Sequence, residues 1–297
     1  MAEKIKVAIV GYGNIGKAAV QAVKEEPDMD LVGLVEPIAV VECKENIKIV
    51  KKISELDSID VAIICAPSRE VPQVAKEIIS SGINTVDSYD IHAGILDFQK
   101  DLDIICKANK KAAIVAAGWD PGIDSIVRGL FLTMAPKGIT YTNFGPGTSM
   151  GHSCAVKVMK GVKGALSITV PAGMGFHKRI VYVELDGKEP IDVVEQTIKK
   201  DPYFIKDETL VIEVKDISKL VTVSHGVMIE RNGVSGTTHN QLFKYECRAN
   251  NPALTSQIMV SSARAVTKQV PGCYTVIDIP IRDFLSEDRD SLIKSLV

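Results

Sequence analysis

Residues 6–16 read KVAIVGYGNIG: a short β-branched run ends at glycine, and the pattern G-x-G-x-x-G follows directly. Apolar residues then recur at helical spacing from Ile15 to Lys24, so the glycines lie between a strand and a helix. In a Rossmann β-α-β unit these glycines allow a tight turn, the approach of a pyrophosphate, and close helix–strand packing, in that order. The predicted dinucleotide-binding residues are Gly11, Tyr12, Gly13, Asn14, Ile15 and Gly16.

Glu36 follows the next predicted strand, 31–35, and lies twenty positions beyond Gly16. An acidic side chain at this place accepts hydrogen bonds from the ribose hydroxyls of NAD, and it repels the 2′-phosphate of NADP. No arginine follows at positions 37–40 to neutralise that phosphate. The sequence therefore predicts a preference for NAD over NADP. The competing interpretations are an ordinary glycine-rich turn for the loop and a solvated surface residue for Glu36.

Strand-like and helix-like patterns continue to alternate up to about residue 118. Further strands are predicted at 60–65, 84–86 and 112–116, with helices at 70–80 and 92–108. Such alternation is typical of right-handed β-α-β units on a parallel sheet. The residues that close the strand 60–65 are expected to line the other edge of the cofactor; they are Cys65, Ala66, Pro67 and Ser68.

The pattern changes after Gly118, where strands follow one another with few helices between them. They are predicted at 139–144, 165–170, 180–185, 210–214, 219–230 and 241–247, with helices later at 252–268 and 286–296. The predicted fold class is α/β, with an N-terminal Rossmann domain followed by a mixed, mainly antiparallel α+β domain. We expect the first domain to comprise residues 1–118, completed by about 265–297, and the second to comprise 119–264.

Composition excludes several classes of protein. In 297 residues, 35 Lys and Arg stand against 37 Asp and Glu, so the chain has no basic field that would gather nucleic acid. The N-terminus shows no signal sequence, and no apolar run is long enough to span a membrane. Six cysteines without a C-x-x-C pair, and histidines without metal spacing, argue against a metal site or a disulfide framework. Reduced thiols indicate a cytoplasmic protein.

Two motifs that directly follow predicted strands contain a candidate acid each. Asp90 lies in VDSYDIH (86–92), and Asp120 lies in GWDPG (118–122). Because ligands of open α/β sheets bind outside the carboxyl ends of the strands, we expect both side chains beside the nicotinamide. Two carboxylates suit a cationic amine substrate, or acid–base chemistry on it. A second interpretation stays open, in which both residues are helix N-caps.

Several motifs resemble those of the meso-diaminopimelate dehydrogenase family. They are VAIVGYGNIG (7–16), PDMDLVG (27–33), VDSYDIH (86–92), GWDPG (118–122), FGPGTSMGHS (144–153), HKR (177–179), SHG (224–226) and NNPALTSQ (250–257). The resemblance covers the whole chain. The short length is similar to that of the subgroup that also aminates 2-keto acids to D-amino acids.

The resemblance implies an enzyme of lysine biosynthesis, a cytoplasmic homodimer whose second domain binds substrate and the partner. Such an enzyme deaminates meso-2,6-diaminopimelate oxidatively at its D-centre to L-2-amino-6-oxopimelate and ammonia, or catalyses the reverse reductive amination. It also implies that Asp90 and Asp120 hold the reacting end. The other substrate-binding residues it implies are Trp119, Phe144, Thr148, Ser149, Met150, Gly151, Thr169, Arg179, His225 and Asn251. Familiar members carry paired arginines after the second strand and use NADP, and this chain departs from them there.

Other interpretations of these residues remain. Taken alone, Arg179 fits an exposed strand position, His225 a packed core histidine and Thr169 ordinary strand packing. His92, His152 and His177 are interpreted as mainly structural. A D-amino-acid or amine dehydrogenase with a smaller substrate is the closest alternative function. A non-catalytic, nucleotide-sensing Rossmann protein is the alternative of another class, which would not need both the acidic pair and Arg179.

Overall fold

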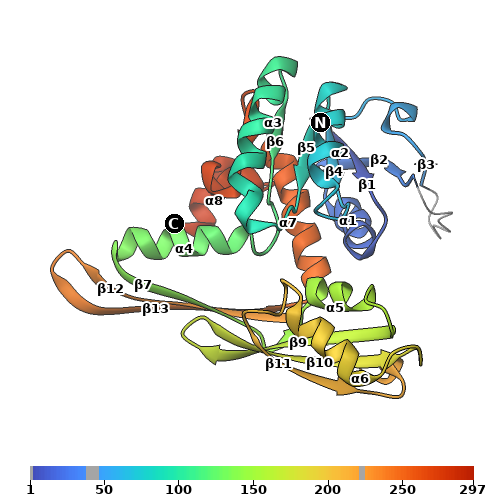
Figure 1. The fold of residues 1–297 in the computed structure, drawn as a ribbon. Helices are drawn as coiled ribbons and strands as arrows, with labels where there is room; N and C mark the ends of the chain where they lie inside the picture. Colours follow the sequence, from blue (N-terminus) through green and yellow to red (C-terminus); the bar gives the residue numbers. More distant parts are fainter. Residues whose placement is uncertain (1–2, 38–46, 221–224) are drawn as a thin grey trace. The chain divides into compact units, whose positions relative to one another are not determined.

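The computed structural model describes residues 3–37, 47–220 and 225–297 (Figure 1). Contacts divide the chain into two compact units. The first runs from the N-terminus to Gly129 and includes Pro252–Val297; the second is Leu130–Asn251. The domain limits near residues 118 and 265 stay a prediction. In the part of the chain that is described, no helix combines the length and the apolar character needed to cross a membrane.

A parallel sheet forms the centre of the first unit, which confirms the predicted Rossmann fold. Its order is β3-β2-β1-β4-β5-β6-β14. The strand bounds are β1 (Ile5–Val10), β2 (Met29–Val35), β3 (Ile49–Val50), β4 (Val61–Ile64), β5 (Asn84–Asp87), β6 (Ala112–Ile114) and β14 (Gly272–Tyr274). The strand order reverses between β1 and β4. Ligands of such sheets bind at this reversal, outside the carboxyl ends of the strands.

α1 (Asn14–Glu25) and α7 (Asn251–Val266) pack against one set of side chains of this sheet, and α2 (Val71–Ser80) and α3 (Ile95–Asn109) pack against another. The other helices are α4 (Ile123–Met134) and α8 (Arg289–Leu296), with short 3-10 turns at Ile53–Glu55, His92–Gly94, Val276–Asp278 and Ile281–Phe284. α1 buries the stripe Gly16, Ala19, Val20 and Val23, as its helical spacing predicted. The helix α4 was not predicted from the sequence.

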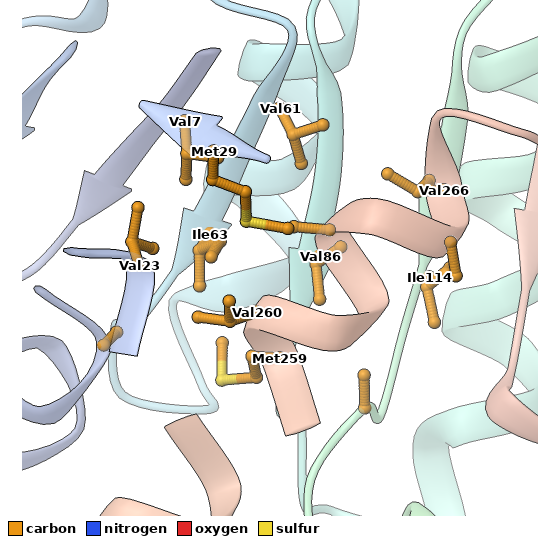
Figure 2. Packing of buried hydrophobic residues seen from close by; sticks show 14 of the residues in the cluster. Val7, Val23, Met29, Val61, Ile63, Val86, Ile114, Met259, Val260 and Val266 are labelled. Carbon is orange, nitrogen blue, oxygen red and sulfur yellow. The ribbon is translucent and has the colours of Figure 1, made fainter. Parts of the chain in front are cut away.

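The apolar core joins α7 to segments far away in the chain. Met259 and Val260 of α7 belong to one buried cluster with Val7 of β1, Val23 of α1 and Ile63 of β4, as Figure 2 shows. α2 and α3 contribute to a second cluster with other residues of the same strands. Each aliphatic side chain buried in this way stabilises the fold by about 1.5–3 kcal/mol relative to exposure.

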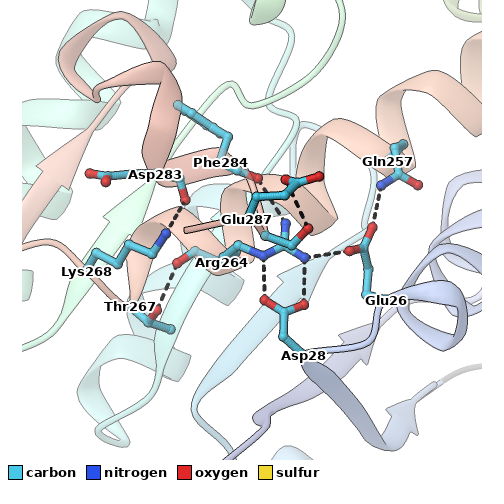
Figure 3. Close-up of polar contacts among 10 residues, drawn as sticks. Glu26, Asp28, Gln257, Arg264, Thr267, Lys268, Asp283, Phe284 and Glu287 are labelled. Atoms are coloured by element: carbon cyan, nitrogen blue, oxygen red, sulfur yellow. Dashed lines mark hydrogen bonds and ion pairs between the residues drawn. The ribbon is translucent and has the colours of Figure 1, made fainter. Parts of the chain in front are cut away.

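The C-terminal segment is tied to the first unit by pairing and by one buried cation. β14 pairs with β6 in parallel, with Gly272 opposite Ala112. Arg264 donates to both carboxylate oxygens of Asp28 and to Glu26, at 2.5–2.7 Å, and to the carbonyl of Phe284 at 2.9 Å (Figure 3). A buried guanidinium with all these partners fixes how α7 enters the unit.

The second unit contains two sheets, where the sequence predicted one mainly antiparallel sheet. One has the order β11-β10-β9-β8 and the other β13-β12-β7. The bounds are β7 (Lys137–Phe144), β8 (Gly147–Thr148), β9 (Val162–Gly173), β10 (Phe176–Leu185), β11 (Glu208–Glu213), β12 (His225–Ser235) and β13 (Thr238–Ala249). All pairs are antiparallel except β10 with β11. Parallel neighbours need a crossover, and α6 (Ile191–Lys200) forms it.

Two differences from the prediction concern local chemistry. The strand predicted at 219–230 is β12 from His225 onward. Lys219 instead ends a 3-10 turn (Ile217–Lys219) that the Asp216 side chain caps, and residues 221–224 lie outside the described part. The helix α5 (Met150–Lys157) was not predicted either. It packs through Val156 on the cluster that α6 covers.

Candidate cofactor and substrate sites

The loop after β1 requires glycine at two positions and leaves space at the third. Gly11 has φ +95°, and a Cβ there would lie 2.9 Å from the carbonyl oxygen of Cys65. A Cβ on Gly16 would lie 2.1 Å from the carbonyl oxygen of Gly11. A Cβ on Gly13 would meet nothing within 4 Å. Gly13 therefore serves no internal packing, and the open space above it fits the approach of a pyrophosphate.

The N-terminus of α1 is also suited to an anion. Its N-cap is Gly13, no side chain caps the first turn, and that turn contains no acidic residue. The first N–H groups of a helix lack partners within the helix, and they lie at the positive end of its dipole. Asn14, Ile15 and Gly16 therefore present N–H groups where Gly13 leaves space, and the residues of this loop fit a dinucleotide.

Glu36 lies against the same loop. Its carboxylate accepts a hydrogen bond from the backbone N–H of Tyr12 at 2.9 Å. The contact fixes the acid at the end of β2, next to the glycines, which is the place where the sequence predicted it would meet the ribose. Lys17 lies nearby, with its ammonium 5.7 Å from the centre of the Tyr12 ring.

The segment after β4 joins the glycine loop to one predicted acid. Cys65 N–H donates to the carbonyl of Val10 at 2.7 Å, so this segment starts beside the end of β1. Burial raises the pKa of the Cys65 thiol to about 12, which keeps it protonated and makes it a poor nucleophile. Ser68 Oγ donates to Asp90 Oδ1 at 2.6 Å, and Asp90 N–H donates back to Ser68 Oγ at 3.3 Å. The structure thus brings together two predicted residues from different loops.

Neither aspartate caps a helix. Asp90 is exposed, and the N-caps of the two helices that follow it are Ile91 and Gly94, without side-chain capping bonds. α4 begins at Ile123, three residues after Asp120. Asp120 is instead held by Arg128, whose Nη1 donates to its Oδ1 at 2.8 Å. The side chain of Asp120 is 10% exposed.

Two further acids nearby were missed as functional candidates. Asp87 and Asp124 are both fully buried, and burial raises the pKa of each carboxyl to about 7. The negative charge of Asp120 contributes to the shift at Asp124. Asp87 was detectable in principle, because an acid that ends a buried strand needs partners. Asp124 carried no comparable signal.

In the second unit, Arg179 sits opposite Thr169 across the β9–β10 pair. Its Nη1 donates to Thr169 Oγ1, and its Nε donates to Asp207 Oδ2 at 2.6 Å. The Arg179 side chain is 11% exposed, so it is not an exposed strand residue, and Thr169 does more than pack. Asp207 lies before β11 in a turn, where no sequence pattern marked it.

Aromatic and imidazole rings gather around Phe144. His225 stacks on Phe144 with ring centroids 6.3 Å apart and an interplanar angle of 14°. Phe144 N–H donates to His177 Nε2 at 2.8 Å, so His177 supports a predicted pocket residue. Because Nε2 accepts this bond, it carries no proton, so His177 is a neutral imidazole with its proton on Nδ1. Burial, and then the charge of Arg179, lower the pKa of His177.

His152 adds a second neutral imidazole to this unit. Its Nε2 lies 3.0 Å from the carbonyl of Tyr203, and its Nδ1 lies 2.7 Å from Ser149 Oγ. Because a carbonyl only accepts, the proton sits on Nε2, and Ser149 donates to Nδ1. Burial, and then the charge of Arg179, lower the pKa of His152 to about 4. His152 therefore fixes the predicted pocket residue Ser149.

The remaining predicted residues occupy defined places. Thr148 of β8 pairs with Ile168 of β9. Met150 and Gly151 begin α5, and Asn251 begins α7. Trp119 is buried beside Asp120 in sequence. Across the described ranges, no group of three or more His, Cys, Asp or Glu side chains is arranged to hold a metal ion.

Comparisons with known proteins match both units. Residues 5–87 match the oxidoreductase family with an NAD-binding Rossmann fold, and residues 118–176 match the diaminopimelic acid dehydrogenase C-terminal domain. The chain is 49% identical over 298 residues to the meso-diaminopimelate D-dehydrogenase of Bacteroides fragilis, and the match covers 99% of this chain and 100% of that protein.

Solved structures agree with these matches. The C. glutamicum diaminopimelate dehydrogenase in complex with diaminopimelate superposes with a TM-score of 0.92 at 28% identity, covering 100% of both chains. An engineered D-amino acid dehydrogenase bound to NADP⁺ superposes with a TM-score of 0.88 at 27% identity, covering 99% of this chain and 100% of that one.

Proposed function

The chain belongs to the meso-diaminopimelate dehydrogenase family, and on this premise we propose that it deaminates meso-2,6-diaminopimelate oxidatively at the D-centre. Hydride loss leaves an imine, which water hydrolyses to L-2-amino-6-oxopimelate and ammonia, and the reverse reaction is reductive amination. The observation that carries the proposal is the combination of a glycine loop open above Gly13 with two carboxylates, Asp90 and Asp120, after neighbouring strands of the same sheet.

Asp90 and Asp120 are proposed to handle the reacting amine. When bound, the nicotinamide supplies the acceptor for a hydride. The amine must be neutral when the hydride leaves, because an ammonium carbon cannot become an imine directly. A carboxylate first holds the cation and then takes its proton. Ser68 orients Asp90 through a 2.6 Å hydrogen bond, and Arg128 orients Asp120 through a 2.8 Å one.

Arg179 is proposed to bind the distal carboxylate. A guanidinium grips a carboxylate in a two-pronged geometry that lysine cannot reproduce. Asp207 holds Nε and Thr169 receives a bond from Nη1, which fixes the plane of the group before substrate arrives. The neutral His152 and His177 add no charge that would compete for it. Phe144, Thr148, Ser149, Met150, Gly151, His225, Asn251 and Trp119 are proposed to complete substrate binding.

The proposed cofactor is NAD rather than NADP. Nicotinamide dinucleotides are the ligands of this oxidoreductase family. The Tyr12 N–H holds the Glu36 carboxylate at the glycine loop, where it would accept from the ribose hydroxyls and repel a 2′-phosphate.

A homodimer is proposed on the exposed face of the three-stranded sheet. Ile139 and Leu242 flank Asn232 as cross-strand neighbours and are 58% and 51% exposed. A hollow of about 560 Å³ opens on the same face, lined by Ile139, Tyr141, Met228 and Asn232 among others. Exposed apolar side chains gathered around a hollow favour burial by a second copy.

A cytoplasmic location is also proposed. Among the described cysteines, Cys65, Cys106, Cys154, Cys247 and Cys273 are all free. Free thiols in this number fit a reducing compartment.

The test is reduction of NAD or NADP, followed by absorbance, with meso-diaminopimelate as substrate. LL-diaminopimelate is the matched control, because it has the same groups but no D-centre. We expect reduction with the meso isomer and none with the LL isomer. Oxidation of D-alanine without oxidation of meso-diaminopimelate would overturn the proposal in favour of a smaller substrate.

A further inference from the structure

The two proposed catalytic loops leave neighbouring strands of one sheet. β5 and β6 pair in parallel, with Thr85 opposite Ala113 and Val86 opposite Ile114. Asp90 lies in the loop after β5, and Asp120 lies in the loop after β6. The separation of the two carboxylates therefore depends on what joins these loops at their bases.

Asp87, the last residue of β5, makes that connection. Its Oδ1 accepts from the N–H of Tyr89 at 2.9 Å, in its own loop, and from the N–H of Ala116 at 3.2 Å, in the other loop. Its carbonyl accepts from Ala117 N–H at 2.7 Å. One residue thus binds both loops, and each bond lies within a few residues of a proposed catalytic acid.

The loop after β6 needs such an anchor. Ala116 has φ +54°, a left-handed conformation that residues with a Cβ rarely adopt without support. Beyond it, Gly118 N–H donates to the carbonyl of Pro121, and Ile123 N–H donates to the carbonyl of Gly118. These bonds close a tight turn around Asp120, so a shift at Ala116 is passed on to that acid.

The Asp87 side chain is a polar group in a buried position. The side chain is fully buried, and its Oδ2 has no hydrogen-bond partner among the described residues. Burying an unpaired carboxylate oxygen is unfavourable. The bonds that Oδ1 makes to the two loops are the interactions that offset this cost.

We propose that Asp87 is a positioning residue of the dehydrogenase: its buried carboxylate sets the separation of Asp90 and Asp120 by holding the bases of both loops. This inference rests on the proposed function, since it assigns both acids to the reacting amine. Asp87 itself touches neither substrate nor cofactor in this role.

The test compares Asp87→Ala and Asp87→Asn with the control Thr85→Val. Thr85 is fully buried on the same strand, and its hydroxyl has no partner in the described chain, so valine perturbs the strand but not the loops. We expect Asp87→Ala to lower kcat about 10- to 100-fold, because small misplacements of catalytic groups have effects of this size. Asp87→Asn should recover part of the loss, since its Oδ1 still accepts. Thr85→Val should stay near the wild type.

Two further readouts separate positioning from instability. Amide hydrogen exchange at Tyr89 and Ala116 should accelerate in Asp87→Ala and not in Thr85→Val, and the dissociation constant for NAD should stay within about threefold of the wild-type value. Rates are expressed per folded, NAD-binding molecule. Unchanged kcat in Asp87→Ala, or unchanged exchange at both amides, would overturn the inference.

Failure of the proposed function has a different signature. If the wild type does not oxidise meso-diaminopimelate, the function is wrong, whereas the exchange experiment still measures whether Asp87 anchors both loops. If Asp87→Ala does not fold, Asp87→Asn carries the test, with kcat lowered and exchange faster than in Thr85→Val as the expected result. Equal values for these two variants would overturn the positioning role.

Discussion

At the residue scale, Asp90 and Asp120 have different surroundings. Asp90 is exposed and bonded to a neutral hydroxyl, whereas Asp120 is 10% exposed and paired with a cation. We expect Asp90→Asn and Asp120→Asn each to lower kcat at least about tenfold, because acid–base assistance contributes about 10²–10⁴-fold. The dissociation constant for NAD should be nearly unchanged. Steady-state kinetics and a fluorescence titration give both quantities; an equal loss of NAD affinity would assign the acids to the cofactor loop instead.

The arginine on β10 gives a prediction about substrate class. Arg179→Met should weaken meso-diaminopimelate binding by about 2–5 kcal/mol, because a charge-assisted pair is lost at a side chain that is 11% exposed. Apolar 2-keto acids, which lack a distal carboxylate, should lose much less activity or gain some. The matched control is Lys178→Met, which removes the adjacent cation of the same strand, paired with Glu208. Equal losses on both substrate classes would make Arg179 structural.

The acid at the end of β2 gives a prediction about the cofactor. In the unmodified protein we expect kcat/KM for NAD to exceed that for NADP by about 100-fold, since repulsion of the 2′-phosphate and the lack of a charge-assisted contact to it together disfavour NADP by about 3 kcal/mol. Glu36→Ser with Pro37→Arg and Ile38→Arg should reverse the order. The control is the double variant Pro37→Arg with Ile38→Arg, which keeps Glu36. Lys44 is the nearest following cation that could neutralise the 2′-phosphate, and it lies outside the described residues, as Ile38 does. A clear NADP preference in the unmodified protein would contradict the proposal.

At the scale of elements, α7 is held by apolar packing and by the Arg264 network. Arg264 is 3% exposed, and its hydrogen bond is the first cause of the lowered pKa of Asp28. Removing one partner of a buried ion pair costs about 3–5 kcal/mol. Because Asp28 is 35% exposed, we expect Arg264→Met to reduce the free energy of unfolding by about 2–4 kcal/mol in urea titrations.

The control for this element is Arg289→Met on α8, whose side chain is 67% exposed. An exposed pair contributes about 0–1 kcal/mol, so this variant should unfold like the wild type. A similar small change in Arg264→Met would show that apolar packing alone holds α7.

At the scale of the whole molecule, substitutions on the exposed face of the three-stranded sheet test the proposed homodimer. The double variant Ile139→Asp with Leu242→Asp places two charges on this face, at exposed residues that both pair with Asn232 across the sheet. We expect a shift from dimer to monomer in light scattering after gel filtration, because a buried unpaired charge is strongly unfavourable. Val270→Asp is the control, at an apolar residue of the other unit that is 72% exposed. Unchanged mass in the double variant would place the interface elsewhere.

The sequence alone determined the parallel Rossmann unit, the roles of Gly11 and Gly16, and the places of Asp90 and Asp120 after their strands. These features follow from periodicity and from residues adjacent in the chain, which local patterns record. Only the tertiary structure revealed the partners Ser68, Arg128, Asp207 and Asp87, the second sheet of the middle unit, and the helices α5 and α6. Ser68 lies 22 residues from Asp90, Asp207 lies 28 residues from Arg179, and Asp87 lies 29 residues from Ala116, so these contacts join segments distant in sequence. A hydrogen bond across two loops leaves no periodic trace in either one.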